Sequence, residues 1–415
     1  MSLAQELINR GFINQFSAAT LEEIVDGEKR TIYHGIDPSA DSAHAGNFVI
    51  WMLLRHLADA GHKIVFLVGG GTGMIGDPKP DSERQLKDAS LVNENVIKLK
   101  TQAEKLFSGY DFEFVNNYDW LKEVKLIDFL RDIGKHYTVN ELIKKDAIAN
   151  RLQSDNGLSY TEFAYPLLQG YDYLELFKNK NCTVQVGGSD QWGNIISGVE
   201  LVRRKEQAEV FAITVPLIID KATGKKFGKS EGNAVWIDGE KTSPYQFYQF
   251  WLNVSDDSVI DYLKLFTLLT LSEIEEVKKD FELNPGNRSA QKRLAFEVTK
   301  IVHGEENTLA AEKVSELLFG GNEKLALNDD EYKVLVENAP SQKVAEGLGI
   351  IDVLVESELA TSKREARTFV ESGAVTLNGV KVDSVESKLD KDYFKNNFAL
   401  LRRGKKKYSV ILLED

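Results

Sequence analysis

Two polar clusters in the first fifty residues have the composition of a phosphate-binding site. Residues 33–38 read Tyr-His-Gly-Ile-Asp-Pro, and residues 44–47, His-Ala-Gly-Asn, open a predicted helix. A helix N-terminus offers unpaired N–H groups and the positive end of a dipole, so it favours phosphate. His44 and Asn47 can add donors in that first turn. Alone this tetrapeptide is a weak signal, because a satisfied surface histidine produces the same pattern.

Two loops are unusually rich in glycine or lysine. Residues 69–76 contain five glycines and directly follow a predicted strand, where a parallel sheet places its ligands. No Gly-Lys-Ser/Thr follows these glycines, so the segment is not a Walker loop, and a structural glycine turn is the alternative. Residues 225–230 surround a glycine with lysines, which suits a flexible cationic clamp for pyrophosphate. A lone basic loop would mean little.

A polar stripe follows in the middle of the chain. Tyr165, Gln169 and Asp172 stand at positions i, i+4 and i+7, so they share one face of a predicted helix. An amphipathic helix with its polar side in water would show the same spacing. A phenol, an amide and a carboxylate on one stripe can also line a pocket for a small zwitterion. A second polar run, residues 185–194, comes shortly afterwards.

The composition is that of a soluble globular protein. The chain has 415 residues, of which 42% are hydrophobic and 28% charged, with 51 Lys+Arg against 64 Asp+Glu and a formal charge of −13. A single cysteine, Cys182, excludes a disulfide framework and a cysteine-rich zinc site. The sequence predicts neither a secretory signal nor a membrane span, so we expect a cytoplasmic protein. The acidic total argues against indiscriminate nucleic-acid binding but permits one local basic surface.

The first half of the chain alternates apolar runs with helical patterns. The predicted strands are residues 31–36, 64–68, 112–116, 183–186 and 210–219, and the clearest predicted helices are residues 44–60 and 190–204. Runs that are apolar on both faces suit parallel strands covered by helices on each side. We therefore predict an α/β fold with a doubly wound, Rossmann-like parallel sheet.

The second half has a different texture. Ser243-Pro244-Tyr245-Gln246 is a capping box, and from there to about residue 316 the pattern is helical. A capping box at Ser362 predicts a short helix that ends at Gly373, and residues 375–382 alternate around Asn-Gly as a hairpin. Residues 348–415 hold 12 Lys/Arg and 11 Asp/Glu, whereas the remaining 347 residues hold 39 and 53. A solvated face is the common explanation of such a basic tail taken alone.

Together, in this order and spacing, these segments resemble the bacterial tyrosyl-tRNA synthetases, which are class I aminoacyl-tRNA synthetases. Residues 44–47 resemble the family's His-Ile-Gly-His signature, and residues 226–230, Lys-Phe-Gly-Lys-Ser, resemble its Lys-Met-Ser-Lys-Ser signature. Residues 187–194 resemble its adenylate pocket. The tail resembles a small RNA-binding module that is shared with a ribosomal protein. The resemblance spans essentially the whole chain, and the joint occurrence of the motifs is specific.

The resemblance implies a pocket for the amino acid tyrosine. Its residues would be Tyr33, Asp77, Tyr165, Gln169, Asp172 and Gln185. Asp172 and Tyr33 are expected to bind the phenolic hydroxyl. Asp77 is expected to hold the ammonium group together with Tyr165 and Gln169, and Gln185 is expected to fix that arrangement.

The resemblance also implies an ATP site. Its residues would be Asp37, His44, Asn47, Gly187, Asp190 and Lys229, with Asp190 on the ribose. The residues expected to act on the phosphates are His44, Asn47, Arg84, Lys226, Lys229 and Ser230. Three positions depart from the family pattern. Asn47 replaces a histidine and cannot become cationic, His34 stands where cysteine is familiar near the ribose, and Ile50 offers no hydroxyl.

The implied organisation has five parts. Residues 1–222 form the catalytic domain with a helical insertion around 120–165, 223–240 the signature loop, 241–320 a helical domain, 321–347 a linker, and 348–415 an α+β RNA-binding domain. The residues expected to contact tRNA are Lys363, Arg364, Arg367, Arg402, Arg403, Lys405, Lys406 and Lys407. Lysine and arginine would supply salt-dependent affinity for the RNA backbone.

The implied reaction joins L-tyrosine, ATP and tRNA(Tyr). The tyrosine carboxylate attacks the α-phosphorus of ATP, and the terminal ribose of the tRNA then takes the tyrosine. We expect Mg²⁺ to accompany ATP, no dedicated protein metal site, and a homodimer whose interface involves the helical insertion. Two alternatives stay open: a synthetase of the same subclass for tryptophan, and an RNA-binding protein on a catalytically silent synthetase body.

Overall fold

A six-stranded sheet organises the N-terminal part of the chain. The computed structural model describes residues 1–79, 82–153, 157–219, 229–230, 233–319, 327–394, 398–404 and 407–414. The strands are β1 (Gln15–Phe16), β2 (Thr31–Ile36), β3 (Lys63–Val68), β4 (Phe112–Asn116), β5 (Cys182–Gly188) and β6 (Phe211–Val215). Their order is β1-β6-β5-β2-β3-β4. All pair in parallel except β1, which is antiparallel to β6. The predicted fold class and four of the predicted strands are confirmed; the fifth, predicted for residues 210–219, ends at Val215, and β1 was not predicted.

The strand order reverses beside β2. From this central strand the chain first adds β3 and β4 on one side, and it later adds β5 and β6 on the other. At such a point the loops that leave neighbouring strands diverge, so a crevice opens at the carboxyl ends of the strands. The topology therefore places the loops after β2, β3 and β5 around one crevice.

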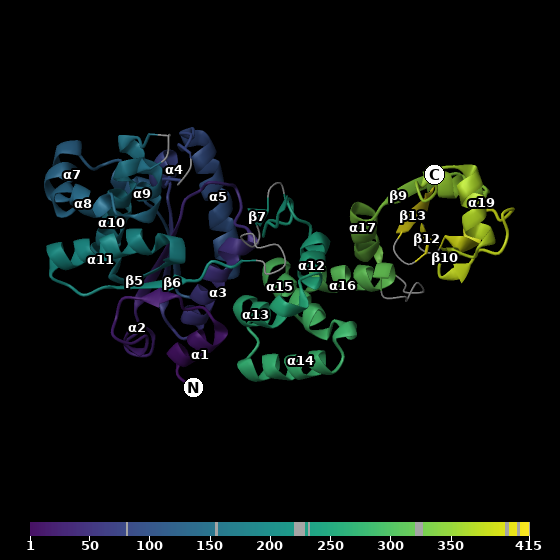
Figure 1. The fold of residues 1–415 in the computed structure, drawn as a ribbon, viewed down its shortest axis with the longest axis horizontal. Helices are drawn as coiled ribbons and strands as arrows, with labels where there is room; N and C mark the ends of the chain where they lie inside the picture. Colours follow the sequence, from purple (N-terminus) through teal and green to yellow (C-terminus); the bar gives the residue numbers. More distant parts are fainter. Residues whose placement is uncertain are drawn as a thin grey trace. The chain divides into compact units, whose positions relative to one another are not determined.

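Both faces of the sheet are buried. The longest helices on them are α3 (Ala45–Asp59), α5 (Ala89–Leu106), α10 (Tyr160–Lys180) and α11 (Trp192–Glu206), with α10 and α11 on one side and α3 and α5 on the other (Figure 1). On β3, Val65 and Leu67 join the same apolar cluster as Tyr173 of α10. The intervening Phe66 meets Trp51 of α3 edge-on, with ring centroids 5.0 Å apart. This alternation explains why the strand sequence is apolar throughout.

The helical insertion lies between β4 and β5. It comprises α6 (Tyr118–Leu121), α7 (Leu126–Asp132), α8 (Val139–Leu142) and α9 (Asp146–Leu152), and it leads into α10. The remaining helices of this part are α1 (Leu3–Arg10), α2 (Glu22–Val25), α4 (Thr72–Ile75), α13 (Asp256–Phe266) and α14 (Leu271–Leu283). Beyond the sheet, β7 (Lys229–Ser230) and β8 (Asn233–Ala234) form a short antiparallel pair.

Contacts divide the chain into two compact units. The first comprises Met1–Lys241 and Val254–Leu294, and the second comprises Thr242–Asn253 and Ala295–Asp415. The second unit includes α12 (Pro244–Leu252), α16 (Glu305–Phe319) and α17 (Asp329–Asn338), and α15 (Ser289–His303) continues from one unit into the other. The predicted capping box at Ser243 is present, because its side chain accepts the N–H of Gln246 while the Gln246 side chain accepts the N–H of Ser243.

The C-terminal sheet has the order β11-β10-β12-β13-β9. Its strands are β9 (Ser341–Val344), β10 (Val375–Leu377), β11 (Val380–Lys381), β12 (Phe398–Arg403) and β13 (Lys407–Leu413), and α18 (Ile350–Glu356) and α19 (Lys363–Glu371) pack on it. Asn378 and Gly379 have φ values of +50° and +76°. These left-handed residues make the predicted hairpin between β10 and β11.

Two elements lie in the range that the sequence assigns to a linker. Helix α17 begins at Asn328, which forms a capping box with Glu331. Strand β9 pairs in parallel with β13 and so belongs to the C-terminal sheet. Across the described ranges, none of the helices is both long and apolar enough to cross a membrane.

Candidate active site

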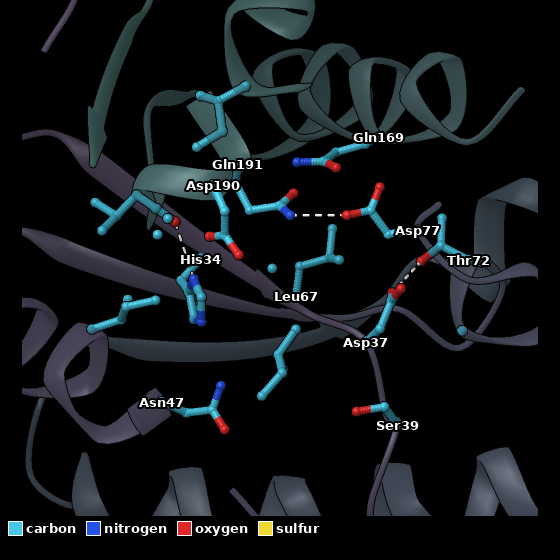
Figure 2. Close-up of a pocket in the computed structure, with 18 of the residues that line it drawn as sticks. His34, Asp37, Ser39, Asn47, Leu67, Thr72, Asp77, Gln169, Asp190 and Gln191 are labelled. Atoms are coloured by element: carbon cyan, nitrogen blue, oxygen red, sulfur yellow. Dashed lines mark hydrogen bonds between the residues drawn. The ribbon is translucent and has the colours of Figure 1, made fainter. Parts of the chain in front are cut away.

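A cavity of about 400 Å³ lies at the carboxyl ends of β2 and β5. Among its lining residues are Tyr33, Asp37, His44, Asn47, Asp77, Arg84, Tyr165, Gln169, Asp172, Gln185, Gly187 and Asp190. The structure thus brings together predicted residues that come from six separate stretches of sequence, and several of them are visible in Figure 2. Lys226 is outside the described residues, and Lys229 and Ser230 are described only as backbone of β7.

One end of the cavity is built around the Asp172 carboxylate. Asn117 Nδ2 donates to its Oδ2 over 2.9 Å, and the indole Nε1 of Trp120 donates to its Oδ1 over 2.8 Å. Burial raises the pKa of Asp172 to about 7, while these two hydrogen bonds lower it. The Tyr33 hydroxyl is buried and has no hydrogen-bond partner among the described residues. A carboxylate beside an unpaired phenol can bind a ligand hydroxyl that both donates and accepts.

A second carboxylate lies farther along the cavity. Asp77 accepts hydrogen bonds from Gln191 Nε2 at 2.9 Å and Asn194 Nδ2 at 3.2 Å, and burial raises its pKa (Figure 2). The side-chain carbonyls of Gln169 and Gln185 are buried, and neither has a hydrogen-bond partner within the described part of the chain. A carboxylate with unpaired amide carbonyls suits an ammonium group, which has donors only.

Tyr165 is positioned by a third carboxylate. Its hydroxyl donates to Asp37 Oδ2 at 2.8 Å, and Thr72 Oγ1 donates to Asp37 Oδ1 at 2.7 Å. Burial raises the pKa of Asp37 to about 6, against the effect of these hydrogen bonds. The Tyr165 ring therefore lines the cavity while its hydroxyl is held by Asp37 rather than by Asp77.

The glycine-rich loop is required for close packing. A Cβ atom on Gly69 would lie 2.0 Å from Asp37 Oδ1, and one on Gly70 would lie 2.2 Å from Asn116 Oδ1. The N–H of Gly70 donates to Asn116 Oδ1 at 3.1 Å, and that of Gly71 donates to Asn117 Oδ1 at 2.8 Å. Because these two N–H groups already have acceptors inside the protein, they are not a phosphate cradle.

His44 and Asn47 form a capping box at the start of α3. His44 Nδ1 accepts the N–H of Gly46 at 3.0 Å, and Asn47 Oδ1 accepts the N–H of His44 at 3.2 Å. Since Nδ1 is an acceptor, the proton of the neutral ring is on Nε2. In the same way, Asn47 keeps its Nδ2 amide as a donor. The capping box therefore fixes both side chains, and their donors His44 Nε2 and Asn47 Nδ2 take no part in it. The helix N-terminus where they lie favours anions.

The chain that follows the lysine loop is attached to this same helix start. His44 forms an isolated antiparallel bridge with Trp236, and the N–H of Ala45 donates to the carbonyl of Val235 over 2.8 Å. The His44 and Trp236 rings are 6.2 Å apart. These contacts anchor the C-terminal side of the lysine loop beside the histidine motif.

The three positions that depart from the family pattern occupy different surroundings. His34 Nδ1 is 3.0 Å from the carbonyl of Val186, so Nδ1 carries the proton and Nε2 can only accept. Burial lowers the pKa of His34 to about 4, which keeps the ring neutral. Ile50 is on the cavity wall, and Asn47 has the capping role described above.

Three residues that hold the site were not identified from the sequence, namely Thr72, Asn117 and Trp120. Gln191 and Asn194 lie in the run 187–194 that the resemblance assigns to the pocket, but their bonds to Asp77 were not predicted. Asn117 directly follows β4 at the carboxyl edge of the sheet, and this place is a signal that could have found it. Trp120 lies three residues later, within the first turn of the insertion. We find no sequence signal for the role of Thr72.

The predicted RNA-binding residues are distributed unevenly in the C-terminal domain. Lys363, Arg364 and Arg367 are exposed on α19. Arg402 is instead buried, and its Nη2 donates to the carbonyls of Leu317 and Leu318 at the end of α16. Lys405 and Lys406 are outside the described residues.

Arg403 and Lys407 lie at the ends of paired strands. Arg403 is half-buried, donates to the carbonyl of Leu359 at 2.6 Å, and stacks on the Phe369 ring at 4.5 Å. Lys407 is exposed. Among the described residues of this predicted set, the exposed basic side chains are therefore those of α19 and of Lys407.

The sequence matches two known families along most of its length. Residues 26–320 match the family described as tRNA synthetases class I (W and Y), and residues 331–411 match the family described as tyrosine--tRNA ligase SYY-like C-terminal domain. Tyrosine--tRNA ligase 2 of Enterococcus faecalis is 45% identical, over 98% of this chain and 98% of that protein. Tyrosine--tRNA ligase 1 of Bacillus subtilis is also 45% identical, over 99% of each chain.

Solved structures agree with this match. A C-terminally truncated mitochondrial tyrosyl-tRNA synthetase of Aspergillus nidulans superposes with a TM-score of 0.69 at 30% identity, covering 77% of this chain and 94% of that one. The tyrosyl-tRNA synthetase of Archaeoglobus fulgidus, solved with L-tyrosine, shares the fold at a TM-score of 0.56 and 17% identity, over 74% and 100% of the two chains. The chain belongs to the class I tRNA synthetases of the tryptophan and tyrosine group, and within that group to the tyrosine--tRNA ligases.

Proposed function

We propose that this protein activates L-tyrosine with ATP to tyrosyl-adenylate and then transfers the tyrosine to the 3′ end of tRNA(Tyr). The observation that carries the proposal is the buried Asp172 carboxylate, held by Asn117 and Trp120 beside the unpaired Tyr33 hydroxyl. A phenol bound there donates to Asp172 and accepts from Tyr33. Phenylalanine would leave the Tyr33 hydroxyl unpaired and would place an apolar ring edge against the buried Asp172 carboxylate, so the site selects for a hydroxyl without an editing reaction.

The remaining polar groups of the cavity suit the rest of tyrosine. Asp77 and the amide carbonyls of Gln169 and Gln185 accept hydrogen bonds from the ammonium group. Tyr165, fixed by Asp37, forms the wall between the amino acid and the nucleotide. With both ends bound, the tyrosine carboxylate is oriented toward the α-phosphorus of ATP.

The nucleotide lies on the other side of the cavity. Asp37, Gly187 and Asp190 contact the adenosine, with Asp190 on the ribose. His44 Nε2 and Asn47 Nδ2 donate to the phosphates, and the cationic groups of Arg84, Lys226 and Lys229, with the Ser230 hydroxyl, offset the charge of the departing pyrophosphate.

The first step needs no protein nucleophile or general base, because the attacking carboxylate is already ionised. The carboxylate oxygen forms a bond to the α-phosphorus as the bond to the pyrophosphate oxygen breaks. Catalysis consists of positioning and of stabilising the charge in the transition state. In the second step the terminal ribose hydroxyl attacks the adenylate carbonyl and releases AMP.

Mg²⁺ would accompany ATP, where it would be held mainly by phosphate oxygens and water. Within the described residues, no group of three or more His, Cys, Asp or Glu side chains is arranged to hold a metal ion. The donors at the start of α3 suit phosphate oxygens rather than a cation. The ion would shield the phosphates while Arg84 and the lysine loop act on the leaving group.

The alternative substrate, tryptophan, fits the same fold less well. Its indole has one donor and no acceptor, so it could donate to Asp172 but would leave the Tyr33 hydroxyl without an acceptor for its proton or a group to accept from. The second alternative, a catalytically silent RNA-binding protein, does not require the set of buried polar groups that meets in the cavity.

The C-terminal domain is proposed to bind tRNA through α19. Lys363, Arg364 and Arg367 are exposed on this helix, and Arg403 and Lys407 end the neighbouring strands. Arg402 contributes by fixing the domain to the end of α16 rather than by contacting RNA. Because the substrates include tRNA and ATP, we place the protein in the cytoplasm.

A homodimer is proposed through the helical insertion. On α7, Leu126, Ile127 and Leu130 are 69%, 70% and 41% exposed. Val139 and Ile143 continue this apolar surface at α8, with 61% and 38% exposed. Exposed apolar side chains gathered on neighbouring short helices are typical of a protein interface, and a second copy of this chain is the partner that the family suggests.

The first prediction concerns the reaction and its specificity. The protein should catalyse tyrosine-dependent ATP–pyrophosphate exchange, and Asp172→Asn should lower kcat/KM for tyrosine by about 100-fold. That loss corresponds to about 3 kcal/mol, the worth of a hydrogen bond to a charged group. The KM for ATP should stay within about twofold. Asp119→Asn changes an exposed carboxylate on α6, serves as the control and should behave like the wild type. Absence of exchange with tyrosine by the folded protein would refute the proposed function.

The second prediction is a pH dependence. Burial raises the pKa of Asp172 to about 7, and the ionised carboxylate is the better acceptor for a phenol, so kcat/KM for tyrosine should rise as the pH rises through about 7. Trp120→Phe removes a hydrogen bond that lowers this pKa, so the midpoint should move up by about one pH unit. Trp251→Phe, a buried tryptophan of α12, is the control. An unchanged or lower midpoint for Trp120→Phe would contradict the assignment.

The third prediction separates adenylate formation from tRNA charging. A chain that ends at Asn338 should retain pyrophosphate exchange and lose most aminoacylation. The cut falls before β9, since that strand pairs with β13.

In the full chain, Arg364→Ala with Arg367→Ala should weaken tRNA binding and lower the slope of its salt dependence by about one for each phosphate that is no longer bound. Lys279→Ala on α14 is the control. Equal charging by the truncated and full-length proteins would rule out the role of this domain.

The fourth prediction concerns the oligomeric state. Ile127→Asp with Leu130→Asp should convert a dimer to a monomer in sedimentation velocity, because each charge would be buried without a partner. Leu283→Asp is the matched control, since Leu283 is 86% exposed at the end of α14. The insertion is excluded as the interface if the double variant sediments as the wild type does.

A further inference from the structure

A buried ion pair joins the helical insertion to the cavity. Arg151 of α9 and Glu162 of α10 have side chains that are 0% and 2% exposed, and Arg151 Nη2 lies 3.2 Å from Glu162 Oε2. Charges taken out of water are costly unless their remaining hydrogen-bonding groups are satisfied. The groups that satisfy the remaining hydrogen-bond donors and acceptors of Arg151 and Glu162 therefore indicate what the ion pair does.

The Arg151 guanidinium is bonded to the loop that precedes Arg84. Its Nη1 donates to the carbonyl of Lys79 at 3.0 Å and to the carbonyl of Ser82, and its Nη2 donates to the carbonyl of Gly157 at 3.0 Å. A planar guanidinium presents its donors in fixed directions, so one side chain sets the positions of two separate backbone segments. An ammonium group could not reproduce this geometry.

Glu162 holds Arg84 directly. Its Oε1 accepts the backbone N–H of Arg84 at 3.1 Å, and its own N–H is capped by Ser159 Oγ at 3.3 Å. The ion pair thus holds the main chain at three described positions, Lys79, Ser82 and Arg84.

The Arg84 side chain is then directed into the cavity by two further contacts. Its Nε donates to the carbonyl of Asp77 at 2.7 Å, and its stem lies over Gly76, where an added Cβ would be 3.0 Å from Arg84 Cγ. Arg84 lines the cavity that also contains Asp37 and Asp77. Burial raises the pKa of both of these carboxyls, and the charge of Arg84 works against that rise.

We propose that Arg151 and Glu162 are positioning residues for Arg84, and that this buried ion pair keeps the Arg84 guanidinium in place to stabilise the pyrophosphate that leaves ATP. The proposal rests on the proposed function. Neither member of the pair is among the described residues that line the cavity, so both act through the loop that they hold. If the ion pair only stabilised the insertion, its removal would lower kcat by the same factor whether or not Arg84 is present.

The test is a set of variants measured by tyrosine-dependent pyrophosphate exchange. Arg151→Met with Glu162→Met removes both charges together and so avoids leaving one buried and unpaired. It should lower kcat about tenfold and leave the KM for tyrosine within about twofold. Arg84→Ala should lower kcat about 100-fold, as expected for the loss of one charge-stabilising donor. The triple variant combines Arg84→Ala with Arg151→Met and Glu162→Met. Its kcat should equal that of Arg84→Ala, because the ion pair then has no guanidinium to position.

The opposite outcome is equally definite. If the triple variant is a further tenfold slower than Arg84→Ala, the effects are independent and the positioning role is overturned. Glu200→Gln with Arg203→Gln removes an exposed ion pair of α11 and should match the wild type.

A second variant is needed if thermal melting shows that the protein with Arg151→Met and Glu162→Met is not folded. Arg151→Lys retains the charge but not the planar donors. It should lower kcat to a smaller extent and again add nothing to Arg84→Ala. Wild-type protein without any tyrosine-dependent exchange would refute the proposed function instead, so the two failures are distinguishable.

Discussion

Three carboxylates share one cavity, the buried Asp172 and the half-buried Asp37 and Asp77, and hydrogen bonds around them offset the free-energy cost of removing charge from water. Asp37, Asp77 and Asp172 each receive two hydrogen bonds from uncharged donors, and burial raises the pKa of all three. Neutral donors satisfy the oxygen lone pairs without neutralising the charge. The cavity is therefore strongly attractive to groups that bring donors or positive charge, and the arginine on its wall is placed by a buried ion pair.

The sequence predicts well what depends on local pattern and topology. Strands that are apolar on both faces predict a parallel sheet, and a parallel sheet places its ligands at the carboxyl edge. The family resemblance then implies that Asp37 and Gly187 belong to one site. The helix caps at Ser243 and Ser362 involve residues three apart, and such short-range hydrogen bonds need no knowledge of the fold.

What escaped prediction depends on contacts between distant segments. Trp120 and Asp172 are 52 residues apart, and nothing local in either segment indicates that an indole caps that carboxylate. Arg402 stands in a run of basic residues that suits RNA, yet alternation along β12 turns its side chain inward to the end of α16. Charge type can be read from a sequence, whereas the side of a strand that faces a neighbouring helix follows only from the assembled domain.

The Asn117 side chain links the two ends of the cavity. Its carbonyl accepts the N–H of Gly71, which fixes the orientation of the amide, and its nitrogen donates both to Asp172 and to Thr72 Oγ1 at 2.9 Å. Thr72 in turn donates to Asp37, so hydrogen bonds that are donated outward from Asn117 in both directions connect the Asp172 carboxylate to the Asp37 carboxylate. A substitution of Asp172 that is selected or designed to accept another amino acid therefore also disturbs Asp37, the carboxylate that orients Tyr165. Changes of substrate in this framework should therefore occur as coupled sets of substitutions rather than one residue at a time.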